Sequence, residues 1–141
     1  MKHEAMLTRL RAQLLRHEGM RLKPYMCPSG KLTIGIGRNL DDKGITRDEA
    51  LLLLDNDIAE CVADLRSIFP KFHTYSVERQ TALCDLRFNL GASGFRQFRK
   101  MIRAVHDEDW QKAATETVAS KWYYQVQPER SNTIYRQLGD G

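Results

Sequence analysis

The sequence predicts an α+β fold that is mainly helical, in which a small antiparallel β lobe lies between an N-terminal helix and a C-terminal helical lobe. Three observations predict it. Apolar side chains recur at helical spacing over residues 1–18. Residues 22–45 contain two prolines and four glycines, which break helices and favour short strands and turns. From residue 46 onward, capping signals alternate with apolar helical patterns. A cleft between two such lobes is the predicted site for an extended ligand.

Length and composition indicate one soluble domain. The chain has 141 residues. A domain of this size buries roughly 70% of the surface that its unfolded chain exposes, so its core needs no covalent staple. Hydrophobic residues make up 42% of the chain, and no apolar run approaches the roughly 20 residues of a membrane span. We predict a single domain over residues 1–141, with a β lobe at about 19–45 and a helical lobe formed by about 1–18 and 46–141.

The first helix is predicted to end beside Glu18. Gly19 follows it, and glycine is typical of the position after a helix C-terminus. Glu18 is therefore expected in the last turn, at the edge of the β lobe. The apolar residues that give the helical spacing are Met6, Leu7, Leu10, Leu14 and Leu15.

The β lobe is predicted to be an antiparallel hairpin with a third strand. Residues 25–26 and 32–34 have the composition of short strands, and the Pro-Ser-Gly sequence at 28–30 suits the turn between them. The third strand is expected near residues 38–40.

The remainder of the chain is predicted to be helical. Thr46 and Glu49 form a capping box that opens a helix, which should end before Pro70. Ser76 can cap the next helix, and Gly91 is expected to close it.

Three further helices are predicted toward the C-terminus. Apolar spacing marks a short helix over residues 95–105. Asp107 can cap a second helix that continues through Trp122. Pro128 fits the first turn of a last short helix.

Charge and cysteine usage restrict the possible partners only weakly. The net charge is +4 and the pI is near 9.1, which favours polyanions such as nucleic acid, anionic lipid or bacterial cell wall. A solvated basic surface explains the charge equally well, and no basic stripe with interleaved aromatics indicates nucleic-acid binding. Three cysteines imply no disulfide framework. Cys61 and Cys84 are expected to be small core residues, whereas Cys27 lies in the glycine-rich segment.

Glu18, Cys27 and Thr33 are the candidate catalytic residues. Eight residues separate Glu18 from Cys27, and five separate Cys27 from Thr33. A carboxyl, a thiol and a hydroxyl on one short hairpin are groups that acid–base or nucleophilic chemistry requires. Each residue alone has an ordinary interpretation: a glutamate at a helix end is normally solvated, and a threonine is common in strands. The histidines show no metal-ligand spacing, so no metal site is predicted.

With this spacing the chain resembles the phage-type lysozymes of glycoside hydrolase family 24. That family has glutamate, eight residues, aspartate or cysteine, five residues and threonine. The resemblance covers most of the chain in order. The matching segments are Glu18-Gly19, Arg21-Leu22, Tyr25, Gly30, Thr33–Gly37, Phe88–Gly91, Gly94-Phe95, Ser120–Tyr123 and Pro128–Arg130.

The resemblance implies a lysozyme-like fold and hydrolysis of peptidoglycan. The bond cleaved would be the β-1,4 link between N-acetylmuramic acid and N-acetylglucosamine, without metal or cofactor. Glu18 would be the general acid that protonates the leaving oxygen. Arg130 matches an arginine that pairs with this glutamate in the family, and we expect it to hold the carboxyl in place. Thr33 would hold the attacking water or orient Cys27.

The role of Cys27 stays open between three alternatives. A thiol is a poor base near neutral pH unless its environment lowers its pKa. Cys27 could act as a thiolate base, as a nucleophile that forms a covalent intermediate, or as a modest helper of Glu18. The choice between the first two decides whether the anomeric configuration is inverted or retained.

The resemblance also implies residues that bind substrate and residues that support the site. Arg38 is expected to form an ion pair with Asp57 across the lobe junction. Phe88 and Leu90 fit the core of a helix as well as they fit a cleft wall. The residues expected to line the cleft are Asn39, Phe88, Leu90 and Lys121.

The function expected from the sequence is that of an endolysin, a monomer that degrades peptidoglycan at the end of a phage cycle. No signal peptide or membrane anchor is recognised, so it would stay in the host cytoplasm until a holin releases it to the periplasm and cell wall. A lytic transglycosylase is the alternative within enzymes. A non-catalytic wall-binding or phage structural module is the alternative outside them.

Overall fold

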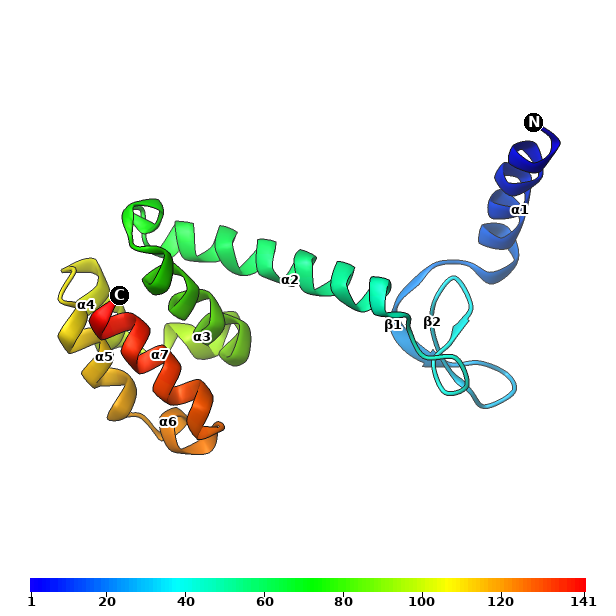
Figure 1. Ribbon diagram of the computed structural model, residues 1–141. Coiled ribbons are helices and arrows are strands. Elements are labelled where there is room, and N and C mark those ends of the chain that lie inside the picture. Colours follow the sequence, from blue (N-terminus) through cyan, green and yellow to red (C-terminus); the bar gives the residue numbers. More distant parts are fainter. The chain divides into compact units, whose positions relative to one another are not determined.

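The computed structural model describes residues 1–141, which separate into two compact units, Met1–Leu51 and Leu52–Gly141 (Figure 1). Each unit is described by itself. The prediction that residues 1–18 join the helical lobe in a single domain concerns the placement of one unit relative to the other, and it stays a prediction. The predicted fold class is confirmed: the chain is mainly helical and has one small antiparallel sheet.

The first unit contains one helix and the three strands of the sheet. Helix α1 ends at Glu18 as predicted, and Gly19 follows with φ 70°, its N–H bonded to the Leu15 carbonyl at 2.9 Å. Left-handed φ values favour glycine because it has no Cβ. The elements are α1 (Lys2–Glu18), β1 (Arg21–Met26), β2 (Leu32–Gly35) and β3 (Arg38–Asn39).

The sheet is an antiparallel meander in the order β1-β2-β3, as the hairpin prediction requires. Thr33 is central in it, because it pairs with Tyr25 of β1 and with Asn39 of β3. Two backbone hydrogen bonds close the turn between β1 and β2. Cys27 donates to the Lys31 carbonyl at 2.9 Å and accepts from the N–H of Gly30 at 2.8 Å.

Helix α2 (Arg47–Ile68) begins with the predicted capping box. The Thr46 hydroxyl accepts from the Glu49 N–H at 3.1 Å, and the Glu49 carboxylate accepts from the Thr46 N–H at 2.8 Å. These bonds satisfy two backbone donors that a helix start leaves without intrahelical partners. The helix begins in the first unit and continues into the second.

The second unit packs short helices around one apolar core. Helices α3 and α5 both contact α7, and α4 contacts α5 (Figure 1). The elements after α2 are the 3-10 helix η1 (Phe72–Thr74), α3 (Val77–Arg96), α4 (Arg99–His106), α5 (Trp110–Val118), α6 (Lys121–Gln125) and α7 (Pro128–Asp140).

Several helix boundaries differ from the predictions. The helix expected over residues 95–105 begins at Arg99 as α4, and Phe95 belongs to α3. Gly91 does not close α3: it adopts φ 78° and ψ 172°, and the helix resumes beyond it to Arg96. A glycine can therefore kink a helix as well as end one. Asp109, rather than Asp107, caps α5 through a bond from the Lys112 N–H at 3.2 Å.

The helix predicted from residue 107 to Trp122 is in fact two helices. Helix α5 ends at Val118, and Ser120 caps the separate α6 by accepting from the Tyr123 N–H at 3.3 Å. A serine cap inside an apolar pattern restarts the helix in a new direction. Pro128 is in the first turn of α7 as predicted, although that helix is 13 residues long rather than short.

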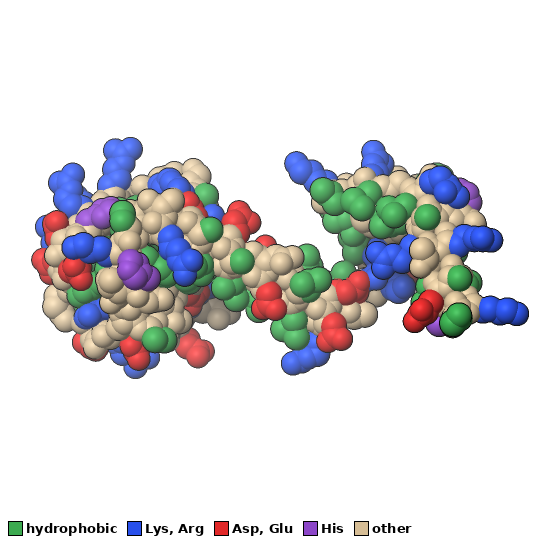
Figure 2. Space-filling model, turned by 90° about the horizontal axis from the view of Figure 1, so that it is seen from above, with side chains coloured by type: hydrophobic (Ala, Val, Ile, Leu, Met, Phe, Trp, Pro, Cys, Tyr) green, Lys and Arg blue, Asp and Glu red, His purple; other side chains and the backbone are tan.

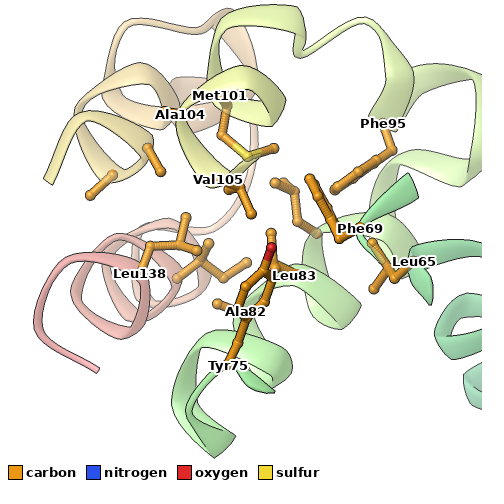
Figure 3. Close-up of a cluster of buried hydrophobic side chains, with 14 of the residues drawn as sticks. Leu65, Phe69, Tyr75, Ala82, Leu83, Phe95, Met101, Ala104, Val105 and Leu138 are labelled. Carbon is orange, nitrogen blue, oxygen red and sulfur yellow. The ribbon is translucent and has the colours of Figure 1, made fainter. Parts of the chain in front are cut away.

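The apolar core lies in the second unit. Figure 3 shows Phe69, Leu83 and Leu138 among its buried side chains. Cys61 is buried as predicted, whereas Cys84 is only partly buried. Of the two tryptophans, Trp122 is buried and Trp110 is partly buried.

The apolar residues of α1, by contrast, are 39–47% exposed, and Figure 2 shows hydrophobic side chains at the surface of both units. No helix of the chain has the length and apolar character needed to cross a membrane.

Candidate active site

The three candidate catalytic residues all belong to the first unit. Glu18 is the last residue of α1, Cys27 follows β1, and Thr33 lies in β2. The hairpin brings Cys27 close to Thr33 along a diagonal: Thr33 pairs with Tyr25, Cys27 bonds to the Lys31 carbonyl, and the Thr33 hydroxyl is within reach of the thiol. Secondary structure alone therefore positions the thiol and the hydroxyl, and the end of α1 supplies the carboxyl.

The Glu18 carboxyl lies against the backbone of Gly37, in the loop between β2 and β3. A Cβ added to Gly37 would stand 2.7 Å from Glu18 Oε2 and 2.9 Å from its Cδ, which is closer than real contacts allow. Gly37 also has φ +72°, a conformation that favours glycine. Glycine at this position thus gives the carboxyl the space that it occupies. The Glu18 side chain is exposed to solvent.

The surroundings of Cys27 favour ionisation of its thiol near neutral pH. Its Sγ lies 3.0 Å from the Ser29 hydroxyl. That hydrogen bond is the largest cause that lowers the pKa of Cys27 from its ordinary 9.0 to about 7, and the Lys31 backbone and the Thr33 hydroxyl lower the pKa further. Hydrogen bonds donated to a thiolate stabilise the charged form.

The other two thiols have the opposite environment. Burial raises the pKa of Cys84 to about 11 and also raises the pKa of Cys61. Apolar surroundings disfavour a thiolate, and a buried thiol in such surroundings is unreactive. Among the three cysteines, Cys27 is thus the one whose thiolate is populated at neutral pH.

Thr33 is buried, with 4% of its surface exposed. Its hydroxyl donates to the Lys31 carbonyl at 2.9 Å. A threonine hydroxyl has one proton to donate and lone pairs that can accept. Thr33 can therefore accept a hydrogen bond from a water, or turn its proton toward a Cys27 thiolate, but it cannot donate to two partners at once.

Arg38 forms its ion pair within the first unit, with Glu49. The expected pairing of Arg38 with Asp57 would join the two units and stays a prediction. The Arg38 guanidinium donates to both carboxylate oxygens of Glu49, at 2.7 and 2.6 Å, and to the Gly44 carbonyl at 3.1 Å. Arg38 lowers the pKa of Glu49 to about 2. Glu49 is the close partner because the capping box with Thr46 already fixes it beside the third strand. The pair anchors the start of α2 to the sheet.

Arg130 forms its ion pair with Asp85 inside the second unit. Its Nε and Nη2 both donate to Asp85 Oδ1, at 2.8 and 2.5 Å. The expected pairing of Arg130 with Glu18 would join the two units and stays a prediction.

The residues expected to bind substrate occupy three different places. Asn39 lies in β3, where its side chain exchanges hydrogen bonds with Asp42, each of 3.0 Å. Leu90 and Lys121 line one depression of about 500 Å³ in the second unit. Phe88 is exposed and lines a separate apolar groove between α2 and α3.

Ser29 and Gly37 are functional candidates that sequence reasoning missed. Ser29 was assigned only to the turn, although a hydroxyl two residues after a cysteine can reach its sulfur. The glycines at 35 and 37 suggest a strand that something approaches closely, but no local signal indicates that the group near Gly37 is the Glu18 carboxyl.

Comparison with known proteins identifies the family. A family model described as phage lysozyme matches residues 15–136, which includes the whole Glu18, Cys27 and Thr33 segment. The chain belongs to the phage lysozyme family. The family model also covers both compact units, so the sheet and the helical core belong to the same family pattern.

Three relatives illustrate the range of this phage lysozyme family. An endolysin of Acyrthosiphon pisum secondary endosymbiont phage 1 is 32% identical over 76% of this chain and 72% of its own length. The "Probable T4-type lysozyme 2" of Dictyostelium discoideum is 27% identical over 92% of each chain. The pre-baseplate central spike protein Gp5 of Enterobacteria phage T4 is 30% identical over 84% of this chain, but the match spans only 25% of the spike protein.

Membership of the phage lysozyme family confirms the prediction that this chain is an enzyme, namely a glycoside hydrolase of the lysozyme type. Peptidoglycan is the substrate that the lysozyme family implies. The roles of the individual residues are not decided by the match.

Proposed function

We propose that this protein hydrolyses the β-1,4 bond between N-acetylmuramic acid and N-acetylglucosamine in peptidoglycan, with Glu18, Cys27 and Thr33 as its catalytic residues. The observation that carries the proposal is the environment of Cys27. A thiol with a pKa of about 7, bonded to Ser29, is positioned at the point where the family pattern has aspartate or cysteine. A general base is most effective when its pKa is near the operating pH.

In this reaction Glu18 donates its proton to the glycosidic oxygen as the bond from that oxygen to the anomeric carbon breaks. Its exposed carboxyl at the edge of the Gly37 loop is accessible to a polymer. Gly37 supports the assignment because it leaves the carboxyl free of a side chain on that face.

Cys27 then completes the displacement by one of two routes. As a base, its thiolate takes a proton from the water whose oxygen bonds to the anomeric carbon, and the configuration is inverted. As a nucleophile, its sulfur bonds to the anomeric carbon, a water later replaces the sulfur with loss of a proton to the Glu18 carboxylate, and the configuration is retained. Proton NMR of the first-formed sugar anomer distinguishes the two routes.

Thr33 is proposed to orient the water or the thiolate. Its buried position in the middle strand makes it rigid, and its acceptor lone pairs are available to a water. Asn39, Leu90, Phe88 and Lys121 are proposed to contact the glycan, and Arg130 to hold Glu18.

The biological role that we propose is lysis of a bacterial host by an endolysin. The likeness to the T4 spike protein supports a second role, in which the same chemistry belongs to a phage particle. Detection of the chain in purified virions by mass spectrometry would favour the particle role, and its absence there would favour the endolysin.

Clearing of permeabilised Gram-negative cells tests the enzyme assignment. We expect Glu18→Gln to clear cells roughly 10²–10⁴-fold more slowly than wild type, the range that a general acid contributes. Glu4→Gln is the matched control, because Glu4 is an exposed glutamate on the same helix. Equal clearing by wild type and Glu18→Gln contradicts the proposal. Anhydro sugars among the products would indicate a transglycosylase instead.

A further inference from the structure

Two arginines of α3 converge on one carboxylate of α2, that of Asp64. Arg87 donates from Nε to Asp64 Oδ2 at 2.6 Å, and Arg96 donates to Oδ2 at 2.9 Å and to Oδ1 at 2.5 Å. The side chains of Asp64 and Arg87 are only 16% and 8% exposed, whereas that of Arg96 is 46% exposed. The two arginines hold the pKa of Asp64 at about 2, so this carboxylate is ionised throughout the physiological range.

The kink of α3 lies between the two arginines. Arg87 precedes Gly91, and Arg96 follows it. Arg96 also donates to the Ala92 carbonyl at 2.9 Å, which ties it to the first residue after the kink. Glycine itself restricts its backbone little, so the angle between the two halves of α3 must be fixed by contacts elsewhere. Asp64 supplies such a contact because it binds both halves from the neighbouring helix.

The same kink shapes the depression of about 500 Å³ in the second unit. Leu90 lies directly before Gly91, and Gly94 and Phe98 come after it, and all three line the depression. Trp122 lines it as well and donates from its indole nitrogen to Asn89 Oδ1 at 2.7 Å, which links that wall to the residues just before the kink.

We propose that Asp64 is a positioning residue for substrate binding: by holding Arg87 and Arg96 on the two sides of Gly91, it fixes the kink and keeps the depression in the form that binds the glycan. Asp64, Arg87 and Arg96 do not line the depression themselves. This inference rests on the proposed function, because it assigns Leu90 and Lys121 to substrate binding.

A purely structural role explains one arginine but not the other. Arg87 is buried and needs a counter-charge, because an unpaired buried charge is costly. Arg96 is half exposed and would be solvated without Asp64. Its three hydrogen bonds therefore serve to hold the segment after the kink, and Arg96 is the better position for a test.

The test compares Arg96→Gln with Arg103→Gln, a matched control at an exposed arginine of α4 that forms no ion pair. On soluble peptidoglycan fragments we expect Arg96→Gln to raise KM about tenfold with kcat unchanged, which is the signature of lost binding common to ground and transition states. Arg96→Lys, which keeps the charge, should restore most of the affinity. An unchanged KM in Arg96→Gln, or a change equal to that of the control, overturns the proposal.

A second measurement is independent of activity. The chain has two tryptophans, and we expect the indole N–H signal of Trp122 to shift in Arg96→Gln while that of Trp110 stays in place. If the wild-type chain does not cut peptidoglycan, the proposed function fails, but the Trp122 signal still decides whether Asp64 and Arg96 fix this wall. Unchanged indole signals in both Arg96→Gln and Asp64→Asn would refute the role of the ion cluster.

Discussion

Replacing Ser29 by alanine should shift the pH dependence of this enzyme's activity to higher pH. The Ser29 hydroxyl is the largest single cause that lowers the pKa of Cys27 from 9.0 to about 7. Ser29 is exposed and lies in a turn, so the Ser29→Ala chain keeps the fold and loses mainly this hydrogen bond. The variant therefore separates the acidity of the thiol from its position.

The magnitude follows from the fraction of thiolate. At pH 7, a thiol with a pKa of about 7 is about half ionised, whereas one with a pKa of 9.0 is about 1% ionised. Ser29 is the largest of several causes, so Ser29→Ala should raise the pKa of Cys27 toward its ordinary 9.0. We expect activity at pH 7 to fall severalfold, and by up to roughly fiftyfold if the pKa of Cys27 returns fully to 9.0, and to recover as the pH is raised through the new pKa.

The assay is the pH dependence of kcat/KM on peptidoglycan fragments, together with the pH dependence of Cys27 alkylation by iodoacetamide. The raised pKa values of Cys61 and Cys84 keep those thiols protonated over this range, so alkylation reports on Cys27 alone. Thr115→Val is the control, because the exposed Thr115 hydroxyl donates to the Gln111 carbonyl within α5 of the second unit. If Ser29→Ala shifts the alkylation curve but leaves the activity curve unchanged, the thiolate takes no part in catalysis.

Two further predictions concern the first unit. Gly37→Ala places a Cβ 2.7 Å from Glu18 Oε2. We expect a loss of activity on the order of 10²-fold, the effect of misplacing a catalytic group by about 1 Å. Gly44→Ala should leave kcat nearly unchanged, because Gly44 has a similar φ of +64° with open space around its Cβ. Equal kcat losses in the two variants would contradict the role of Gly37. The other prediction concerns the ion pair of Arg38 with Glu49, in which the pKa of Glu49 is lowered from 4.5 to about 2. The pair therefore stabilises the fold fully above pH 4.5, and this stabilisation is lost as the pH falls toward 2. Thermal unfolding of Arg38→Gln should therefore show a weaker dependence on pH over that range than wild type, and an identical dependence would refute the coupling.

The elements that could be predicted from the sequence are those with local signals. The end of α1 at Gly19, the capping box of α2 and the strands on both sides of the Pro-Ser-Gly turn each depend on residues within one or two turns of one another. The candidate catalytic residues also have a local signal, because they lie in one short segment from the last turn of α1 to β2, and their roles stay predictions.

What could not be predicted depends on contacts between residues distant in sequence. A glycine such as Gly91 is expected at the end of a helix and at a kink within one, so the residue itself does not distinguish the two. The contact that holds both halves of α3 comes from Asp64, 27 residues earlier in the chain. The sequence does not indicate the ion pair between Arg38 and Glu49, because this pairing depends on which acidic side chain of the first unit the fold brings into reach. Glu49 reaches Arg38 because the capping box holds the side chain of Glu49 in place.

The turn after β1 explains how a thiol can function at a position where the family pattern also has aspartate. An aspartate is ionised near neutral pH without assistance, whereas a thiol needs donors directed at its sulfur. The turn supplies them: its tight closure by the Gly30 N–H brings the Ser29 hydroxyl within 3.0 Å of Cys27. The place of Cys27 in a turn serves the same end, since Cys61 lies in the apolar core, Cys84 packs against it, and burial raises the pKa of both. On the proposed function, a cysteine can therefore take the place of aspartate here only in combination with the serine two residues later, and Ser29 is needed for the proposed role of Cys27.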